Sequence, residues 1–281
     1  MLESYLPLVS IVIPTTDNNP ETNLYLKLCI EGIALSTYPN IETVIVCEGL
    51  ERSQQLNIGI SRSHGKYIMR CDDDWLMQPN VITESVELIE SSELFFKEFP
   101  EKPNPNQCDF VCVNNIFLRS NSTLREVRRI EREIITSNTT TSNLHIAGNF
   151  YRKSDLGLNP FNENLYGGEE YDVHDWLVSL GKTFKLAQSY CIHLRETSSW
   201  MQFLRESFYY GKNLKTYLST NPNKMRMSLI RTYYLKDLNR FNSPKLLFGF
   251  IFFKTLQYVG AFFGLISFMK RDSRKLTGES K

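Results

Sequence analysis

The sequence lacks an excess of charge of either sign. It has 32 Lys and Arg residues against 31 Asp and Glu residues, which gives a formal net charge of +1 at pH 7. Proteins that bind nucleic acid usually carry a basic excess, so we expect no nucleic-acid partner. Internal repeats are also lacking. Hydrophobic residues make up 42% of the chain and charged residues 22%, which favours a packed core over disorder.

The six cysteines lack the spacing of a zinc or redox site. Cys108 and Cys112 are the nearest pair, but they do not form a CxxC motif and no second pair matches them. We therefore expect small buried hydrophobic side chains in a reduced, cytoplasmic protein. The chain begins Met-Leu-Glu-Ser-Tyr-Leu-Pro and passes directly into an apolar run, so we expect no signal peptide.

The first third of the chain alternates short apolar runs with helical patterns. The runs at 8–14, 41–47 and 66–71 are typical of strands that are buried on both faces, whereas 23–36 and 54–64 have helical periodicity. This alternation predicts an α/β fold with a parallel sheet and helices on both of its faces.

The rest of the chain becomes increasingly helical. From residue 199 helical patterning dominates, so we predict an α/β domain over 1–211 and a helical C-terminal region over 212–281. Between the alternating first third and residue 199 we predict two helices, over 79–98 and 169–180. We also predict a strand over 110–118 and strand-like stretches over 144–151 and 182–193. The segment 119–132 is charged, and we expect it to be exposed.

The sharpest local feature is an acidic triplet, Asp72-Asp73-Asp74, which directly follows the predicted strand at 66–71. Ligands of open α/β sheets bind at the carboxyl ends of strands. Adjacent carboxylates repel one another unless a cation or hydrogen bonds stabilise them, and Mg²⁺ and Mn²⁺ prefer oxygen ligands. Taken alone, the triplet is consistent with a metal site, with a solvated acidic turn or with a helix N-cap cluster.

A second acidic cluster, Glu169-Glu170-Tyr171-Asp172, follows Gly167 and Gly168 and begins a predicted helix. Acidic side chains in the first turn of a helix complement its dipole. They could equally supply a general base that removes a proton from an acceptor hydroxyl. Both interpretations remain open for this cluster taken by itself.

Four segments taken together resemble the GT-A family 2 glycosyltransferases in order and spacing. They are LVSIVIPTTD at 8–17, VIVCEG at 44–49, LNIGISRSHGKYIMRCDDDW at 56–75 and GNFYRKSDLGLNPFNENLYGGEEYDVHDWLVSLGKTF at 148–184. The resemblance covers residues 7–211. It implies a Rossmann-like GT-A fold, with a mixed, mainly parallel sheet flanked by helices and followed by a C-terminal helical extension.

The resemblance also implies an activity. It is inverting transfer of a hexose from a nucleoside-diphosphate sugar to a hydroxyl of a glycan or lipid-linked acceptor, assisted by Mn²⁺ or Mg²⁺. The Asp72/Asp74 pair is similar to the DxD motif of the family, whose acids hold the metal and contact the ribose and diphosphate of the donor. The metal then acts as a Lewis acid on the leaving nucleoside diphosphate.

Individual site residues follow from the same matches. Glu170 stands where the family has its catalytic base, but the pair here is Glu-Glu rather than Glu-Asp, so Glu169 remains an alternative. His193 is a candidate metal ligand or an ordinary strand-end histidine. The implied metal ligands are Asp74, Asp72 and His193, and the implied donor-binding residues are Pro14, Thr15, Thr16, Glu48, Asn57, Asp72 and Asp73.

The sequence departs from the family at some of these positions. The family often has an aromatic residue at the position of Thr16, and its usual Asp-Asp-Gly-Ser is Cys47-Glu48-Gly49-Leu50 here, so the nucleobase stays open. Trp75 is a candidate for shaping the sugar pocket. Arg195 is either a candidate for neutralising phosphate charge or an ordinary surface arginine. A noncatalytic nucleotide-sugar-binding or scaffold protein is the alternative function. A nucleotidyltransferase would need a basic, glycine-rich loop that 15–21 does not supply.

The most apolar stretch, 246–268, is long enough to cross a bilayer. Lys254 near its centre costs about 2.5–3.5 kcal/mol on insertion, which leaves a single span marginally favourable. Lys254, Gln257, Ala261 and Gly264 would share one helical stripe that faces water or another helix.

Topology favours a helix that does not cross the membrane. Nucleotide-sugars are cytosolic, so the catalytic domain should lie in the cytosol. The basic residues that follow the apolar stretch also prefer the cytosolic side; they are Lys270, Arg271, Arg274 and Lys275. We therefore expect a protein at the cytoplasmic face of a membrane, with 246–268 peripheral or re-entrant. The alternatives for 246–268 are a single span, burial on the catalytic domain and burial in a homodimer. The expected partners are a nucleotide-sugar donor, a glycan or polyprenol-linked acceptor, as in polysaccharide or glycan biosynthesis, and the membrane surface.

Overall fold

The chain forms two compact units. The computed structural model describes residues 6–98, 106–139, 146–165, 167–195, 197, 199–220 and 233–276. The first unit, here called the sheet unit, contains Met1–Ile116, Thr139–Glu163 and Glu169–Arg195. The second, here called the helical unit, contains Phe117–Asn138, Asn164–Gly168 and Glu196–Lys281.

The sheet unit is built on a mixed sheet. In the described residues it has seven strands in the order β2-β1-β3-β6-β5-β7-β4. β1 pairs in parallel with β2 and β3, whereas β6 pairs antiparallel with β3 and β5, and β4 pairs antiparallel with β7. The strands are β1 (Val9–Pro14), β2 (Ile41–Val46), β3 (Tyr67–Arg70), β4 (Trp75–Met77), β5 (Phe110–Phe117), β6 (Phe150–Arg152) and β7 (Phe184–His193).

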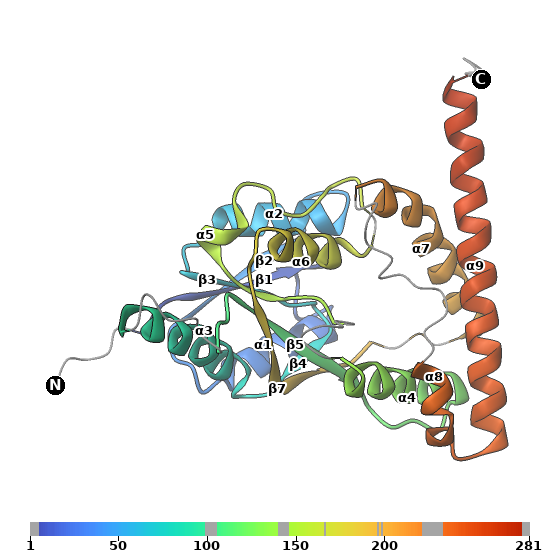
Figure 1. The fold of residues 1–281 in the computed structure, drawn as a ribbon, viewed down its shortest axis with the longest axis horizontal. Helices are drawn as coiled ribbons and strands as arrows, with labels where there is room; N and C mark the ends of the chain where they lie inside the picture. The colour runs from blue at the N-terminus through green and yellow to red at the C-terminus, as the bar shows by residue number, and fades with distance from the viewer. Residues whose placement is uncertain are drawn as a thin grey trace. The chain divides into compact units, whose positions relative to one another are not determined.

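Helices cover both faces of this sheet (Figure 1). Alternate residues of β1 point to opposite faces: Ile11 and Ile13 join the cluster that includes Leu26 of α1, whereas Val12 meets α2. A Cβ at Gly59 of α2 would come within 2.2 Å of the Val12 side chain, so glycine permits this close approach. The helices are α1 (Leu24–Ala34), α2 (Arg52–Arg62), α3 (Val81–Glu98), α5 (Lys153–Leu156) and α6 (Glu169–Ser179).

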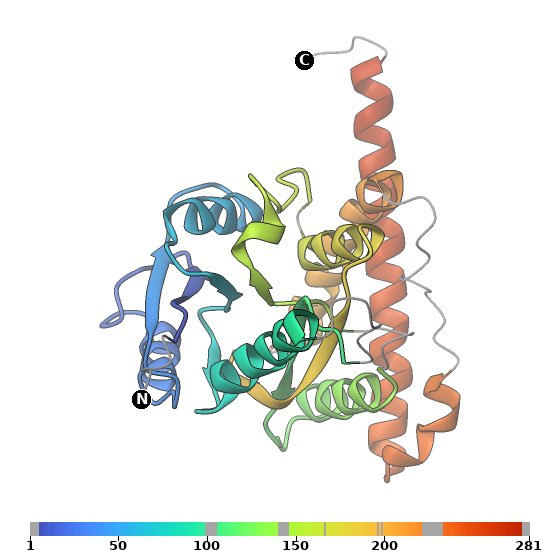
Figure 2. The same ribbon diagram turned by 60° about the vertical axis from the view of Figure 1, so that its left-hand side comes forward.

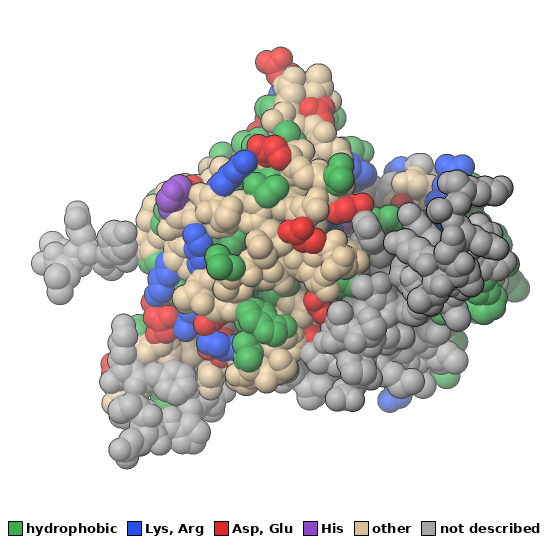
Figure 3. Space-filling model, turned by 90° about the horizontal axis from the view of Figure 1, so that it is seen from above, with side chains coloured by type: hydrophobic (Ala, Val, Ile, Leu, Met, Phe, Trp, Pro, Cys, Tyr) green, Lys and Arg blue, Asp and Glu red, His purple; other side chains and the backbone are tan. Residues whose placement is uncertain are grey.

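The predicted fold class is confirmed: a mixed α/β sheet is flanked by helices and followed by a C-terminal helical region. Its parallel part consists of β2, β1 and β3, as the alternation in the first third of the chain predicts. None of the six cysteines, all of them in described residues, forms a disulfide; five are buried, as expected, but Cys47 is exposed. On the face shown in Figure 3, acidic and basic side chains are interspersed, in keeping with the balanced charge.

The helical unit contains α4 (Thr123–Ser137), α7 (Trp200–Thr220), α8 (Tyr233–Lys236), a 3-10 turn η2 (Leu238–Arg240) and α9 (Pro244–Leu276). Both α4 and α7 pack against α9 (Figures 1 and 2). The shared core consists of Leu124, Val127, Ile130, Ile134, Phe203, Tyr234, Phe241, Phe250 and Phe253.

The prediction that 119–132 is an exposed charged segment is wrong. α4 buries Leu124, Val127, Ile130 and Ile134 in the core of the helical unit. Their spacing of three and four residues forms an apolar stripe along one side of the helix. The stripe is hard to see in the sequence because at least one charged residue adjoins every member of it.

In α9, residues Pro244–Ser267 are long and apolar enough to cross a membrane, with a mean hydropathy of 1.6. Only 22% of that window is buried. Lys254 forms an ion pair with Glu131 of α4, which also accepts a hydrogen bond from the Tyr234 hydroxyl at 2.8 Å. A Cβ at Gly264 would collide with the backbone of α7. The stripe predicted to hold Lys254 and Gly264 therefore faces other helices.

Candidate active site

The acidic triplet lies where β3 ends and the chain turns back into β4. The backbone N–H of Trp75 donates to the Asp72 carbonyl at 3.1 Å, which closes this turn. β4 then pairs antiparallel with β7, with Trp75 opposite His193. The amide of Leu194 donates to the Asp74 carbonyl at 2.8 Å. The turn and the edge pairing together bring the triplet and the end of β7 to one place.

Asp73 is held by hydrogen bonds from the first loop. The Thr15 hydroxyl donates to its Oδ2 at 2.7 Å, and the Asn23 amide donates to the same oxygen at 3.3 Å. Asn23 is also the N-cap of α1, where its Oδ1 accepts from Leu26 N at 3.1 Å. The structure thus brings together Thr15 and Asp73, two of the predicted donor-binding residues.

Asp72 lies between two guanidinium groups. It forms an ion pair with Arg52, and its Oδ1 lies 3.0 Å from Arg70 Nη1. Burial favours the neutral carboxyl, but the charges of Arg52 and Arg70 outweigh it and lower the pKa of Asp72. Asp72 is therefore an ionised carboxylate that already has cationic partners.

Arg52 also reaches the second acidic cluster. Its Nη1 lies 3.3 Å from Glu169 Oε1, so one guanidinium joins the triplet to the first turn of α6. Glu169 is buried, and burial together with the charge of Glu170 raises its pKa, although Arg52 opposes this effect. Glu170 beside it is partly exposed. The two acidic clusters of the sequence therefore belong to one site.

Positively charged neighbours compensate the charge of Asp74 less fully than that of Asp72. Burial and the charges of Asp72 and Asp73 raise the pKa of Asp74 to about 7, and Arg195 only partly opposes them. His193 Nδ1 lies 3.7 Å from Asp74 Oδ2, and Arg195 Nε lies 4.0 Å from the same atom. An additional cation beside Asp74 would stabilise its ionised form.

These residues fit a metal ion that is shared with a bound phosphate. In the described part of the chain, no group of three His, Cys, Asp or Glu side chains is arranged to hold a metal ion by itself. Mg²⁺ and similar ions, however, often bind through one or two carboxylates and complete their coordination with water and substrate phosphates. Asp74 supplies one carboxylate, and His193 beside it stays a predicted ligand. Asp72, also a predicted ligand, is engaged by arginines.

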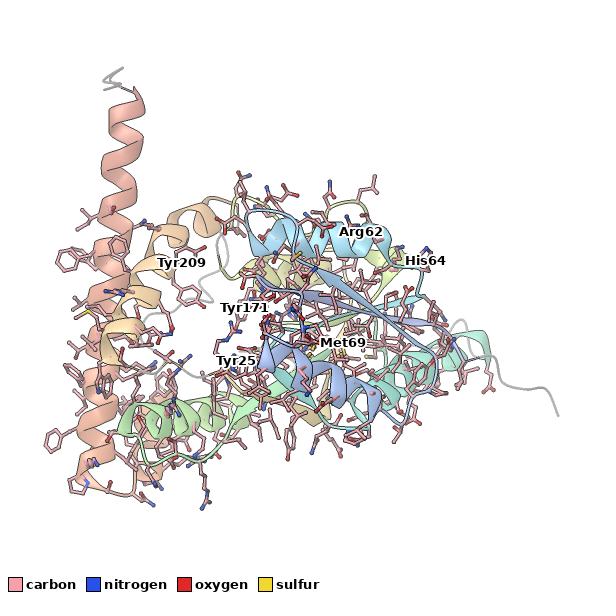
Figure 4. All side chains as sticks on the ribbon, turned by 180° about the vertical axis from the view of Figure 1, so that it is seen from behind. Tyr25, Arg62, His64, Met69, Tyr171 and Tyr209 are labelled. Carbon is pink, nitrogen blue, oxygen red and sulfur yellow. The ribbon has the colours of Figure 1, made fainter. Side chains whose placement is uncertain are left out.

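Arg195 and Tyr25 form the exposed border of the site. Arg195 Nη2 lies 3.6 Å from Asp73 Oδ2, and its guanidinium stacks over the Tyr25 ring at 4.9 Å. The Arg195 side chain is 48% exposed, so it can also meet a ligand. Tyr25 projects from α1 (Figure 4). Arg195 is therefore a half-exposed cation beside the triplet, and its phosphate-neutralising role stays a prediction.

Other predicted residues have different surroundings. Pro14 ends β1 and is buried, and Thr16 is exposed. Glu48 is exposed and pairs with Arg62 of α2 at 3.0 Å, a residue that Figure 4 shows away from Tyr25. The Asn57 side chain binds the loop after α5: its Nδ2 donates to the Phe161 carbonyl at 2.8 Å, and its Oδ1 accepts from Phe161 N at 3.0 Å. Asn57 therefore holds a loop.

Sequence reasoning missed the arginines of the site. Arg52 begins α2 and Arg70 ends β3, and neither falls in a motif that marks it. The Arg70 guanidinium lies 5.1 Å from the Trp75 ring. Trp75 is only 2% exposed, so it supports Arg70 and does not line an open sugar pocket. The available signal was position alone, since Arg52 begins α2 and Arg70 stands two residues before the acidic triplet.

Comparisons with known proteins give structural similarities only. No protein-family model matches the chain, and no curated protein matches it significantly. It is similar to the mannosyltransferase PcManGT from Pyrobaculum calidifontis in complex with GDP-Man and Mn²⁺, with a TM-score of 0.49 and 11% identity over 94% of this chain and 75% of that one. It is also similar to residues 1–349 of TarS from S. aureus, with a TM-score of 0.42 and 11% identity over 97% of this chain and 92% of that one. A complex of TarS with UDP-GlcNAc gives a TM-score of 0.41.

Proposed function

We propose that this chain is an inverting glycosyltransferase of the GT-A family 2 type, which moves a hexose from a nucleoside-diphosphate sugar to a hydroxyl group. The observation that carries the proposal is the position of Arg52, which pairs with Asp72 and lies 3.3 Å from Glu169. The two acidic clusters that resemble the donor and base motifs of that family are therefore parts of one site.

The carboxylates divide the chemistry between them. Glu170 is partly exposed and is the proposed base; Glu169 is buried beside Arg52 and positions that arginine. Glu170 takes the proton of the acceptor hydroxyl while the hydroxyl oxygen forms a bond to the anomeric carbon. The bond from that carbon to the diphosphate oxygen breaks on the opposite side. A single displacement of this kind inverts the anomeric configuration.

The other end of the site receives the donor. Arg195 is half exposed beside Asp73 and can pair with the diphosphate, while Thr15 and Asn23 hold Asp73 toward the donor. Asp74 and His193 would hold Mn²⁺ or Mg²⁺, which supplies Lewis-acid stabilisation of the charge that develops on the leaving diphosphate. The proposed acceptor is a glycan or a polyprenol-linked sugar, handled at the cytoplasmic face of a membrane.

Donor hydrolysis and transfer test this function. UDP-, GDP- and dTDP-sugars are incubated with the full chain and Mn²⁺, and nucleoside diphosphate release is measured. We expect one donor class to turn over, and Asp74→Ala and Glu170→Ala to abolish transfer while keeping the wild-type circular dichroism. Glu31→Ala is the matched control, because Glu31 is an exposed carboxylate of α1 outside the site. Retained transfer in both site variants would refute the assignment.

Isothermal titration with the same donors distinguishes the transferase from the alternative function. A noncatalytic nucleotide-sugar-binding or scaffold protein would bind a donor in the presence of Mn²⁺ but release no nucleoside diphosphate. The altered loop at 47–50 and the Glu-Glu pair at 169–170 motivate this alternative. Binding with turnover supports the transferase.

A further inference from the structure

One side of α9 is apolar and open to solvent. The exposed fractions are 71% for Phe248, 54% for Ile251, 48% for Phe252, 59% for Phe262 and 58% for Phe263. With 3.6 residues per turn, these positions share one side of the helix. We call Phe248, Ile251, Phe252, Thr255, Val259, Phe262 and Phe263 the outer face of α9. Its single polar member, Thr255, donates to the Ile251 carbonyl at 2.9 Å, so it needs no water.

The opposite side of α9 is occupied by protein. Gly249 lies against α4, where a Cβ would come within 2.8 Å of the Thr123 methyl group. Lys254 pairs with Glu131 of α4. Gly260 lies against Ser207 of α7 in the same way. α9 is therefore covered by α4 and α7 on one side, and lipid could reach it only from the outer face.

This packing is incompatible with a membrane span by α9. Lys254, in the middle of the apolar stretch, is fastened to α4, so a bilayer centred there would also enclose α4. That helix carries Arg129, which pairs with Glu126 at 2.6 Å and also with Glu133. Charged side chains are costly at the centre of a bilayer. A helix in the plane of the interface buries the outer face and leaves α4 in water.

Charge distinguishes a lipid surface from a second copy of the chain. Lys245 is exposed at the start of α9, and the sequence has Lys270, Arg271, Arg274 and Lys275 near its end. If two outer faces packed together, a parallel or an antiparallel arrangement would bring these basic ends next to each other. Anionic lipid headgroups are complementary to both ends.

We propose that α9 lies in the plane of an anionic lipid surface, with its outer face inserted at the boundary of headgroups and acyl chains. α4 and α7 remain on the aqueous side. The contact is peripheral and does not cross the bilayer. This proposal extends the membrane location considered above and does not depend on sugar transfer. Loss of lipid binding can therefore be recognised separately from loss of sugar transfer.

Vesicle flotation of the full chain tests the proposal. We expect co-flotation with phosphatidylcholine vesicles that contain phosphatidylglycerol, and weaker binding to phosphatidylcholine alone. Phe262→Ser/Phe263→Ser should lower the partition coefficient by about tenfold or more, because it removes two inserted aromatic rings. Phe248→Ser, at the other end of the outer face, should act in the same direction. Leu35→Ser/Leu158→Ser, exposed leucines of the sheet unit, is the matched control and should leave binding unchanged.

Two further measurements can overturn the proposal. In sealed inside-out vesicles from cells that produce the chain with a C-terminal tag, protease should digest the tag together with the sheet unit; a protected tag would mean a span. Sedimentation equilibrium without lipid should give a monomer. A dimer that Phe262→Ser/Phe263→Ser dissociates would assign the outer face to a second copy. Absence of flotation would reject the lipid surface outright.

Discussion

Asp72, Asp73 and Asp74 are identical side chains in sequence, yet each has its own surroundings. Asp72 lies between Arg52 and Arg70, which lower its pKa. Asp73 accepts hydrogen bonds from the first loop. Burial and its acidic neighbours raise the pKa of Asp74 to about 7. The first carboxylate thus contributes stability when ionised, whereas ionisation of the third opposes folding.

Substitution of these two residues should have opposite effects on stability. In a buffer at pH 8 that contains a metal chelator, Asp72→Asn should lower the free energy of unfolding by about 1.5–3 kcal/mol, because Arg52 and Arg70 lose their counter-charge. Asp74→Asn should raise it, because a desolvated charge is removed. Thermal unfolding followed by circular dichroism measures both effects. Shifts of the same sign in the two variants would contradict the environments described for them.

The choice between the two glutamates can also be tested. Glu170→Gln should lower kcat by about 10²–10⁴-fold, since it removes the proposed base, while the Kd for the donor stays near the wild-type value. Glu169→Gln should keep more of kcat, because its role is to hold Arg52. Single-turnover kinetics and donor titration separate the two effects. If Glu169→Gln causes the larger loss of kcat, Glu169 is the base.

At the scale of elements, the sequence predicts the strands and helices whose pattern is local. The alternation from β1 to β3 follows from short apolar runs and helical periodicity. β4 was not predicted, because three residues carry no pattern and the strand forms only by pairing with β7. Arg52 could not be assigned for a similar reason: its partners Asp72 and Glu169 are distant in the chain, and only the folded sheet brings them together.

Glu84 connects α3 to β7, the neighbour of the edge strand β4. Its carboxylate accepts hydrogen bonds from the N–H groups of Gln188 at 2.6 Å and Ser189 at 2.9 Å, and from the Ser189 hydroxyl. Burial alone would raise its pKa, but these hydrogen bonds outweigh burial and lower the pKa below 4.5. The ionised form is therefore favoured in the folded state. Its contribution to stability is present above the unfolded pKa and is lost as pH falls through the folded pKa.

Glu84→Gln should consequently destabilise the protein by about 1–2 kcal/mol at pH 7. The difference from the wild type should shrink as the pH falls below 4.5. Urea unfolding at a series of pH values measures it. Glu87→Gln, an exposed position on the same helix, is the control and should have little effect at any pH. A difference that grows toward acid pH would reverse the sign argued for Glu84.

Lys254 and Glu131 connect α9 to α4 through a largely buried ion pair, with side chains 14% and 13% exposed. Lys254→Met removes the ammonium group that pairs with the largely buried Glu131 carboxylate, so we expect a loss of about 3–5 kcal/mol. Lys254→Met/Glu131→Met should recover most of this loss. Thermal unfolding of the two variants, with Lys245→Met as a control on the exposed end of α9, provides the measurement. No recovery in the double variant would contradict the pairing.

At the scale of the whole molecule, the helical unit is assembled from separate stretches of chain, with α4 contributed from the middle of the sequence. A truncation after residue 243 removes α9 and uncovers the buried face of α4. We expect this truncated chain to aggregate in gel filtration and to bind ANS, whereas truncation after residue 268 leaves the packed part of α9 in place. A monomeric, ANS-negative product after truncation at residue 243 would mean that α9 is a detachable appendage.

This arrangement also has a consequence for biosynthesis. A ribosome adds about 5–20 residues per second, so α9 emerges on the order of ten seconds after α4. During that interval Leu124, Val127, Ile130 and Ile134 have no partner from α9, and the chain between them and α9 must fold without completing the helical unit. A chaperone would find its binding site in α4 during this time. Attachment of α9 to any other surface can begin only after α9 itself has emerged from the ribosome.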